Sequence, residues 1–525
     1  MLMPPRPDAV VVGAGHNGLV AAIALARSGL SVVVCEADAV VGGAARTEYP
    51  FTRAPGVGAS SGAYLLGLMP PEVLRATGLR LPLIRRDPHY FLPTTGRAHL
   101  LFGSDRASTR RQCLEFFSER DWLAIEALGR EIGELRDDLA PSWLEEPAPI
   151  EQIADRYVRP HLRRVFLDLA QRPVEEYLAR FGFESPLILA MYAVTDGFSG
   201  LSASFGMRGT GLNFLVHNMC RLPGSAGTWM VVEGGMGRVT QELARLAAEA
   251  GVGIRTFAAV SRIDVRAGRA VGVTLADGNE VGASVVVSGT DPFTLRALVG
   301  AQRFPEAFNA KLERLKRTGT TLKVNFALDD LPPFRCLPEP RGQYRATIHL
   351  LPQVADVVAE LRRAFDCAQR GELPEWPAIE WYTHTAVDPT LQDERSRHSG
   401  AFFVQWVPYE LRRGSWDDQE AAYARTLFEI ADLFAPGFSR AIVDVDILTP
   451  KTIERRFGMT YGHIHHVDNT FGFDERMPYA TPIDGLYACG AGCHPAGSVI
   501  GAAGLVAARR VLRDMGWEGH GSRLA

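Results

Sequence analysis

The chain has 525 residues, of which 46% are hydrophobic and 22% are charged, the balance of a globular protein with a sizeable core. This composition excludes intrinsic disorder or a fibrous repeat as a description of the whole chain. The formal net charge of −4 lacks the strong basic excess typical of a nucleic-acid-binding protein, so we expect no nucleic-acid partner.

A buried strand, a glycine turn and a helix follow one another at the start of the chain. Ala9–Val12 is rich in β-branched residues, which suits a parallel strand covered on both faces. Gly13-Ala14-Gly15-His16-Asn17-Gly18 comes next, and an alanine-rich helix over Leu19–Ser28 leads to a second buried strand at Ser31–Cys35. A G-x-G-x-x-G sequence in this setting predicts a Rossmann-type dinucleotide-binding domain.

Each glycine of this turn has a separate physical role. Gly13 permits the tight turn, Gly15 lets the backbone approach a pyrophosphate, and Gly18 lets the helix pack on the strand. The N–H groups at the start of the helix face the phosphates. Glu36, with Ala37 beside it, follows the second strand and is expected to accept a hydrogen bond from a ribose hydroxyl.

A second glycine-rich segment, Gly42-Gly43-Ala44-Ala45-Arg46-Thr47, follows closely. It resembles the second fingerprint of flavoproteins in the amine oxidase and carotenoid desaturase superfamily. The resemblance implies that Arg46 lies near the flavin and its pyrophosphate, and it favours FAD over NAD as the dinucleotide.

The stretch 81–223 carries no cofactor signature and is predicted to be mainly helical, with apolar residues at three- and four-residue spacing in Gln112–Leu139 and Ile150–Phe181. Arg156, Arg159 and Arg163 would share one face of the second helix. A basic amphipathic helix can lie on an anionic membrane, but acidic neighbours make a solvated face the simpler interpretation.

A third cofactor-related segment lies between residues 231 and 291. The sequence predicts a helix over Arg238–Ala250 and a strand over Val252–Val260. In the flavoproteins that it resembles, the strand around Val260 touches the adenine, and the turn that holds Gly289 lies close to the cofactor.

The stretch 318–460 also lacks a cofactor signature. It predicts a helix at Asp417–Phe434 and strands at Thr321–Ala327, Thr347–Leu351, Ala401–Val407 and Ala441–Leu448. We expect an α/β (α+β overall) protein. Its FAD-binding domain would comprise residues 1–80, 224–317 and 461–525, and its inserted mixed α/β substrate domain would comprise 81–223 and 318–460.

Three histidines lie within four residues, at His463, His465 and His466. Strand alternation would put His463 and His465 on one side, an arrangement that suits a metal or an acid–base pair. Because no distant carboxylate or cysteine ligands are evident, we expect no metal, and we take His465 and His466 as candidates for acid–base or substrate-binding roles.

The C-terminal segment 484–504 is again rich in glycine, and a helix is predicted to start near Val499 with its N–H groups aimed at an anionic or electron-rich ring edge. Resemblance to the same superfamily implies that Gly490, Val499 and Ile500 lie against the ribityl chain and the isoalloxazine. His494 is either a proton acceptor or a turn residue.

Together these segments resemble phytoene-desaturase-like FAD oxidoreductases, above all the group named after "pyridine nucleotide-disulfide oxidoreductase domain-containing protein 2". The resemblance implies hydride transfer from a carbon of a hydrophobic substrate to flavin N5, forming a C=C or C=N bond. His465, His466 or His494 would accept the proton, and dioxygen or a quinone would accept the electrons. The alternatives are a flavin amine or amino-acid oxidase and a flavin-binding partner protein without turnover.

The family name suggests a disulfide reductase, but the sequence does not. No redox cysteine pair follows Gly43, where the next cysteine is Cys113, and no second G-x-G-x-x-G occurs. We therefore expect no reduction of the flavin by NADH or NADPH. Without a signal-peptide pattern or a run of 18 apolar residues, we expect a cytoplasmic protein, with peripheral membrane contact as an open alternative. The sequence does not indicate an oligomeric state.

Overall fold

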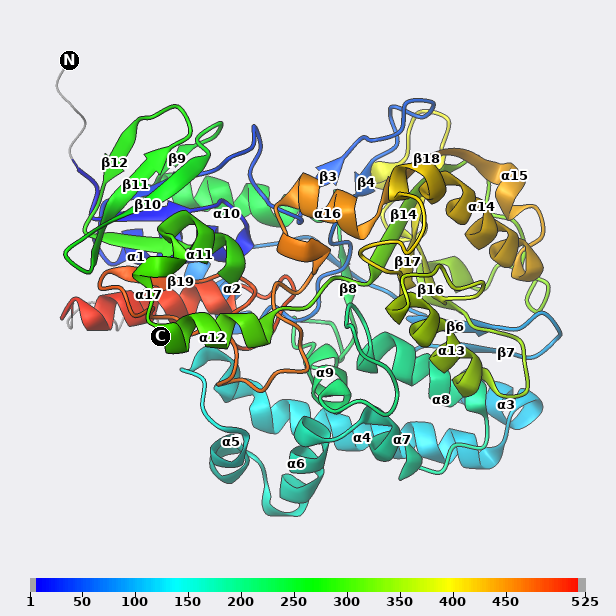
Figure 1. Ribbon diagram of the computed structural model, residues 1–525. Helices are drawn as coiled ribbons and strands as arrows, with labels where there is room; N and C mark the ends of the chain where they lie inside the picture. Colours follow the sequence, from blue (N-terminus) through cyan, green and yellow to red (C-terminus); the bar gives the residue numbers. More distant parts are fainter. Residues whose placement is uncertain (1–5, 518–525) are drawn as a thin grey trace.

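A five-stranded parallel sheet forms the centre of the first unit (Figure 1). The computed structural model describes residues 6–517, so the first five and last eight residues of the predicted FAD-binding domain lie outside the described residues. In sheet order the strands are β19 (Leu486–Ala488), β13 (Val285–Ser288), β1 (Ala9–Val12), β2 (Val32–Cys35) and β9 (Gly253–Arg255). All residues of β1 and β13 are buried, as expected for the middle of a covered parallel sheet.

Three helices pack together beside this sheet. The central one, α1 (His16–Arg27), contacts both α10 (Gly237–Glu249) and α17 (Ala502–Asp514). It begins three residues earlier than predicted, because the last residues of the glycine turn already form its first turn. A three-stranded antiparallel sheet of β10 (Val260–Arg266), β11 (Arg269–Leu275) and β12 (Glu280–Gly282) lies next to β13.

A seven-stranded sheet is the core of the second unit, on the right of Figure 1. In sheet order its strands are β18 (Ile442–Leu448), β14 (Thr321–Leu328), β17 (His398–Gln405), β16 (Ala378–Thr383), β15 (Thr347–Leu350), β6 (Tyr90–Pro93) and β7 (His99–Phe102). The four strands predicted here all occur, with ends shifted by at most three residues. Helix α14 (Trp416–Phe434) packs its buried face against this sheet, where Phe428 lies among Phe326 and Phe402.

The helical character predicted for Gln112–Leu139 is confirmed, but the segment is not one continuous helix. The structure has α3 (Arg106–Phe116) and then α4 (Glu119–Leu139). Ser118 separates them, because its side chain accepts the hydrogen bond from the N–H of Asp121 and so caps the start of a new helix.

The segment Ile150–Phe181 is also helical, as predicted, but it is divided into several pieces. Pro160 and Pro173 lack the N–H that a helix interior requires, and the chain breaks at both. The resulting pieces are α5 (Ile150–Tyr157), a short 3-10 turn, α6 (Arg163–Gln171) and α7 (Val174–Ala179).

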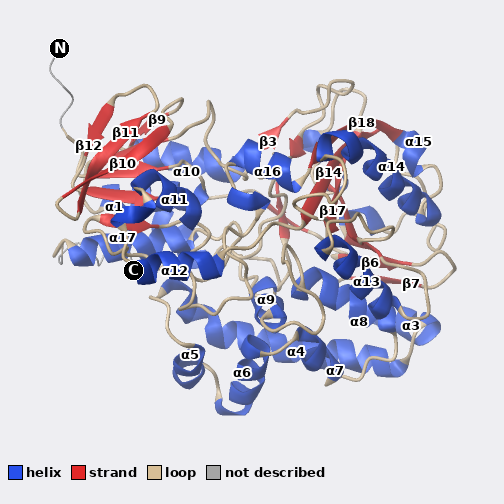
Figure 2. Ribbon diagram, in the orientation of Figure 1, coloured by secondary structure: helices blue, strands red, loops and turns tan. Residues whose placement is uncertain are grey.

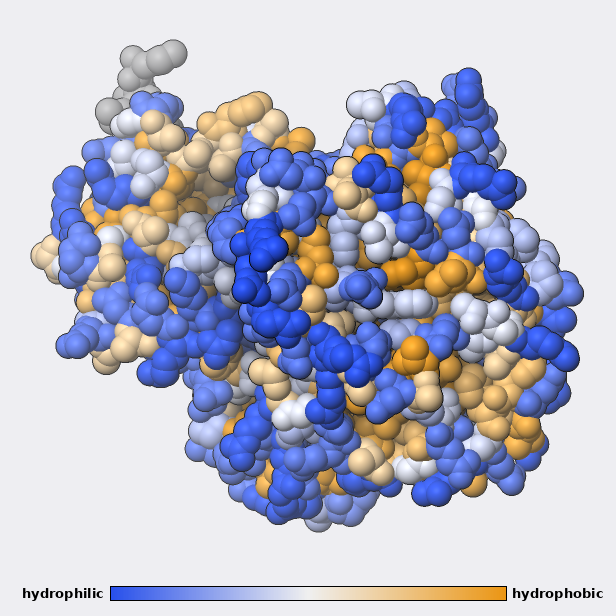
Figure 3. Space-filling model, turned by 45° about the vertical axis from the view of Figure 1, so that its right-hand side comes forward, coloured by the Kyte–Doolittle hydropathy of each residue, from blue (hydrophilic) through white to orange (hydrophobic). Residues whose placement is uncertain are grey.

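The expected basic helix face does not form, because its three arginines lie on different pieces and each pairs with a carboxylate. The pairs are Arg156 with Glu145 at 3.1 Å, Arg159 with Asp138 at 2.7 Å and Arg163 with Asp155 at 2.7 Å. The face in Figure 3 is largely hydrophilic, with apolar residues in separate patches. Within residues 6–517, no helix combines the length and apolar character needed to cross a membrane.

Helices and loops fill the space between and below the two sheets (Figure 2). The remaining helices are α2 (Pro71–Thr77), α8 (Pro186–Tyr192), the π-helical turn η3 (Ala193–Gly197), α9 (Thr210–His217), α11 (Pro292–Val299), α12 (Glu306–Leu315), α13 (Val357–Gln369), α15 (Phe438–Ala441) and α16 (Pro450–Phe457). The short strand β5 (Leu83–Arg85) pairs with β8 (Met230–Val232), so segments assigned to different predicted domains share hydrogen bonds. The predicted domain boundaries therefore stay a proposal, although each of the two large sheets draws its strands from one predicted domain.

Several histidines are almost fully buried in the fold. Burial lowers the pKa of His349, His384 and His465 to about 3 and the pKa of His494 to about 4, against an ordinary value near 6.5. Between these values the unfolded chain binds more protons than the folded chain. The stability associated with the neutral imidazoles is therefore complete above pH 6.5 and is lost as the pH falls toward 4.

We therefore expect the free energy of unfolding to fall steeply below pH 6.5, by up to about 1.4 kcal/mol per pH unit for each proton difference. Urea midpoints measured from pH 8 to pH 5 check this. His349→Leu should reduce the slope by about one proton, whereas the control His161→Ala, at an exposed histidine, should leave the slope as in the parent. The same slope in His349→Leu and in the parent would contradict this account.

Candidate functional site

A cavity of about 560 Å³ extends between the two units. Its first wall consists of the glycine turn after β1, the segment 42–46, Gly289 and Val499. Its second wall consists of residues on or next to β14, β15, β16 and β17. Fifteen of the eighteen predicted cofactor residues line it. The exceptions are Ala14, Gly490 and Ile500.

The glycines of the first turn divide into two kinds. A Cβ on Gly18 would lie 2.2 Å from the carbonyl oxygen of Gly13, so the fold itself requires glycine there. A Cβ on Gly15 would meet nothing within 4 Å, and the φ of −69° at Gly15 suits any residue. Packing within the protein therefore does not explain Gly15, whereas a ligand held against the backbone does.

The N-terminus of α1 and the carboxylate of Glu36 complete this cradle. No side chain caps α1, so its first N–H groups are free to face a phosphate. Glu36 accepts hydrogen bonds from the N–H of Ala14 at 2.7 Å and of Asp38 at 3.0 Å. A carboxylate has further lone pairs, so the predicted ribose contact is compatible with these bonds. Arg46 pairs with Asp38 and lines the cavity.

Several buried polar atoms along this wall have no hydrogen-bond partner among the described residues. They are His16 Nε2, Asn17 Oδ1, Arg46 Nε, His465 Nδ1 and His466 Nδ1. Unpaired buried polar atoms are rare in folded proteins because each costs free energy. Their position along a glycine cradle fits a large polar ligand, and the pyrophosphate and ring system of a flavin dinucleotide satisfy that description.

The second wall is joined to the first through Lys323 on β14. Its ammonium donates to the carbonyl oxygens of Ser60, Ser61 and Gly62 at 2.5, 2.8 and 2.9 Å and lies 4.5 Å from the centre of the Tyr64 ring. Burial lowers the pKa of Lys323 well below its ordinary value. The loop 60–64 thereby lies between the cradle and the sheet.

A buried polar network lies behind the second wall. Asp196, in the π-helical turn η3, lies 3.2 Å from Nδ1 of His217. Glu380 on β16 accepts hydrogen bonds from Thr195 at 2.5 Å and from Tyr382 at 2.6 Å. Burial raises the pKa of Glu380. Thr195, His217 and Tyr382 also line the cavity.

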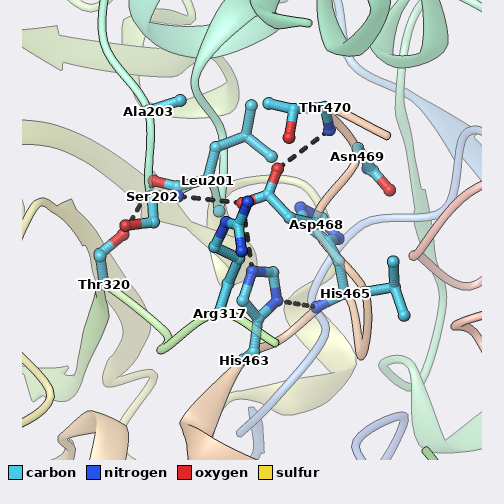
Figure 4. A network of polar contacts seen from close by, with 12 residues as sticks. Leu201, Ser202, Ala203, Arg317, Thr320, His463, His465, Asp468, Asn469 and Thr470 are labelled. Atoms are coloured by element: carbon cyan, nitrogen blue, oxygen red, sulfur yellow. Dashed lines mark hydrogen bonds and ion pairs between the residues drawn. The ribbon is translucent and has the colours of Figure 1, made fainter. Parts of the chain in front are cut away.

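The histidine-rich segment is a turn and not a strand, so the expected alternation was wrong. Tyr461 has a φ of +61°, and η8 (Thr460–Gly462) precedes the histidines. His463 faces away from the cavity and lies 3.3 Å from Asp468, which also accepts from the N–H of Ser202 and of Thr470 (Figure 4). These hydrogen bonds of Asp468 hold the histidine-containing turn in place on the side away from the cavity.

His465 and His466 both line the cavity, as a catalytic role requires. Nε2 of His465 lies 2.9 Å from the carbonyl oxygen of Ser199, which leaves Nδ1 without a partner. His466 has a φ of +60°. Its pKa is lowered, because burial outweighs the opposing effect of the nearby Asp291. Both imidazoles are neutral at pH 7, and a neutral imidazole can accept a proton.

His494 does not line the cavity. Its Nε2 lies 2.9 Å from the carbonyl oxygen of Ser142, and its ring packs edge-on against Phe473. The structure therefore places it as a buried turn residue, the second of the two sequence interpretations, and its proposed proton-acceptor role has no support from this geometry.

Two further expectations for the first unit need correction. The last helix begins at Ala502 and not near Val499, because Gly501 takes the left-handed conformation and the chain before it runs along the cavity. The strand expected over Val252–Val260 is split between β9 and β10, with Phe257 at a φ of +52° between them. Val260 still lines the cavity.

Sequence reasoning missed the residues of the second wall. They include Tyr64, Arg86, Tyr90, Thr195, Ser199, His217, Trp229, Lys323, Thr347, Tyr382 and Phe403. They come from separate strands and loops and form no motif. One signal was present: Lys323 and Glu380 each lie in a strand whose other residues are mostly apolar, and an ionisable residue in a buried strand indicates a polar interior site.

Comparison with known proteins identifies the family. Residues 18–344 match the family model described as flavin containing amine oxidoreductase. The chain is 35% identical to "pyridine nucleotide-disulfide oxidoreductase domain-containing protein 2" of Mus musculus, over 97% of this chain and 94% of that protein. The chain therefore belongs to the flavin-containing amine oxidoreductase family, which implies a flavin cofactor.

Two further proteins are similar over different parts. Hydroxyneurosporene desaturase of Cereibacter sphaeroides is 30% identical over 55% of this chain and 57% of its own. A variant of putrescine oxidase shares the fold, with a TM-score of 0.57 at 17% identity over 97% of this chain and 98% of that one. The resemblance to carotenoid desaturases and amine oxidases is thus confirmed.

The two kinds of glycine in the cradle predict different effects for substitutions at Gly15 and at Gly18. Gly15→Val should abolish flavin binding while the stability of the flavin-free protein changes by no more than about 1 kcal/mol, because the side chain enters open space at an ordinary φ. Gly18→Ala should instead destabilise the flavin-free protein by about 1–3 kcal/mol through its clash with Gly13. Flavin absorbance after gel filtration and urea denaturation of the apoproteins measure both effects. A Gly15→Val protein that retains a full complement of flavin would refute the assignment of the cradle.

Proposed function

We propose that this member of the flavin-containing amine oxidoreductase family is an FAD-dependent dehydrogenase or desaturase. It would transfer hydride from a carbon of a largely hydrophobic small molecule to the flavin and leave a double bond in the product. Dioxygen or a quinone would then accept the electrons. The observation that carries this proposal is the continuous cavity that joins the glycine cradle of the first unit to the aromatic and polar wall of the second.

The length of the cradle favours FAD among flavins. Glu36 and Val260, which suit the ribose and adenine of a dinucleotide, line the same cavity as the turn that suits its pyrophosphate. Val499 and Ala44 line it further along. A mononucleotide would leave the Glu36 end of the cradle without a ligand.

When bound, FAD supplies an acceptor for two electrons and a hydride. The residues of this chain bind and orient the substrate and exclude water. The ring centre of Tyr64 lies 4.5 Å from that of Tyr382 and 6.0 Å from that of Phe403. The three rings form an apolar wall against which a substrate can pack. We assign proton acceptance to His465 or His466, because each has an unpartnered Nδ1 beside the cavity.

An amine or amino-acid oxidase is the second candidate, and one feature favours it. The wall beyond the cradle holds ionisable groups, with Arg86 and His217 on its surface and Asp196 and Glu380 behind it. A substrate that carries an amine or a carboxylate would find partners there, whereas a pure hydrocarbon would not. Flavin reduction by amines, and release of ammonia, separates this reaction from formation of a C=C bond.

A flavin-binding partner protein without turnover is the third candidate. It predicts that no small molecule reduces the flavin and that the flavin-free protein binds its partner unchanged. Mass spectrometry of small molecules that copurify with the protein, followed by anaerobic mixing of each with the oxidised protein, distinguishes it from the two enzymes.

The first test is the cofactor itself. We expect the purified protein to be yellow and to release one FAD per chain on denaturation, because one cradle of dinucleotide length is present. Chromatography of the released flavin with FAD and FMN standards measures this. Release of FMN, or a thermal stability that saturating FAD leaves unchanged in a colourless protein, would overturn the proposal.

The second test concerns the reductant. We expect NADH and NADPH to leave the flavin oxidised over many seconds of anaerobic mixing. All seven cysteines are free, and burial raises the pKa of Cys489 and of Cys493, so neither forms a reactive thiolate pair. Dithionite, which needs no binding site, is the positive control. Bleaching by NADH at about 1 per second or faster, a rate typical of turnover, would reveal a nicotinamide site.

A further inference from the structure

We propose that Arg86 binds a carboxylate group of the substrate, so that the substrate is an organic acid with an apolar body. The inference rests on the proposed function, since it assumes that the cavity beyond the flavin cradle holds the substrate. It refines the expectation of a merely hydrophobic substrate by giving that molecule one anionic end.

Arg86 is placed on the cavity by one pairing of backbone strands and by two hydrogen bonds of its side chain. It directly follows β5, which pairs with β8, and Trp229 directly precedes β8. Nε of Arg86 donates to the carbonyl oxygen of Trp229 at 3.2 Å, and Nη1 donates to the hydroxyl of Thr347 at 2.8 Å. Both contacts are neutral acceptors. The guanidinium is held in a fixed direction while its charge is not neutralised by them.

The side chain is buried but reaches the cavity. Arg86 is 3% exposed and lines the cavity wall. Among the residues that the structure describes, Arg86 donates from Nε and Nη1 only, and its guanidinium forms no ion pair with a carboxylate. Removing such a charge from water without a partner is costly.

The other buried arginines show what a purely structural role looks like. Arg476 donates five hydrogen bonds, four of them to backbone carbonyl groups, and its guanidinium is fully used. Arg46 and Arg397 each pair with an aspartate. Arg86 has neither a full set of hydrogen-bond acceptors nor a paired aspartate, although among these arginines only Arg476 is more deeply buried.

The two acidic groups nearby are engaged elsewhere. Asp196 pairs with His217 and accepts from the hydroxyl of Tyr90 at 3.4 Å. Glu380 accepts from Thr195 and Tyr382, and burial raises its pKa, which favours its neutral form. Neither carboxyl group forms an ion pair with Arg86, although Glu380 lies near enough to favour its charge. An anionic group of the ligand would serve as the counter-ion of Arg86.

The surroundings indicate the rest of the ligand. Tyr64, Tyr90, Trp229, Tyr382 and Phe403 line the cavity together with Arg86. Such a wall accommodates an aliphatic or aromatic body, and the planar guanidinium matches a carboxylate through parallel N–H···O bonds. Loop 60–64 connects this wall to the flavin cradle, so a substrate anchored at Arg86 extends its body toward the cradle.

Calorimetric titration of the yellow protein at fixed ionic strength tests the inference. The probes are hexanoate, decanoate, benzoate and phenylacetate, each compared with its neutral primary amide. We expect at least one acid to bind at least tenfold more tightly than its amide, the ratio expected for hydrogen bonds to a charged group. Arg86→Met should remove that preference, and Arg86→Lys should retain part of it.

Arg85→Met is the matched control. It removes the same charge one residue away, from a side chain that does not line the cavity, and should leave the preference for acids intact. Retention of flavin and an unchanged melting temperature show that each variant is folded. Should Arg86→Met unfold, Arg86→Gln, which keeps a donor for Thr347, replaces it.

Three results would overturn the inference: equal binding of acids and amides, no binding of any acid, or an undiminished preference in Arg86→Met. The flavin tests described above are independent of these. If the protein contains no FAD, the proposed function fails, and titration of the same probes into the flavin-free protein still reports on Arg86. If FAD is present and acids are not preferred, only the substrate assignment fails.

Discussion

The ammonium group of Lys323 ties the two units of the protein together at the wall of the cavity. A buried charge is tolerated only when hydrogen bonds replace its water, and here the carbonyl oxygens of residues 60–62 do so. The loop must therefore stay within reach of β14. Because the N–H of Ala63 donates to the carbonyl oxygen of Ala44 at 2.9 Å, the same loop holds the segment after Gly43. The hydrogen bonds from Lys323 to residues 60–62 thus help to fix the position of the cofactor cradle relative to the substrate wall.

The parts of the fold that local chemistry determines could be predicted from the sequence. The turn after β1 is recognisable because its glycines follow a buried strand at fixed spacing, and four of the seven strands of the second sheet, β14, β15, β17 and β18, were predicted. The cradle residues follow directly from the turn. The sequence could not, however, separate the glycine that packing requires, Gly18, from the one that only a ligand explains, Gly15, because that difference lies in what surrounds each Cβ.

The rest depends on contacts between distant segments. The helical segment predicted over Ile150–Phe181 has the right periodicity, but Pro160 and Pro173 divide it into separate helices. The histidine segment was interpreted as a strand because alternation alone does not reveal the left-handed turn at Tyr461. Arg86 carries no motif at all. Its significance appears only when Trp229 and Thr347, from two other parts of the chain, are seen to hold it without neutralising it.

The order in which the strands of the first sheet occur along the chain has a consequence for biosynthesis. β1 and β2 are made first, but their sheet is completed by β9, β13 and finally β19, whose residues come after the whole of the second unit. On the ribosome, the helix α1 and the edge of β13 must therefore wait, without α17 and β19 to cover them, until residues 486–514 have been synthesised. Pairings between segments so far apart close slowly and expose apolar surface in the meantime. The first sheet therefore cannot be complete in any fragment that lacks either residues 9–12 or residues 486–488.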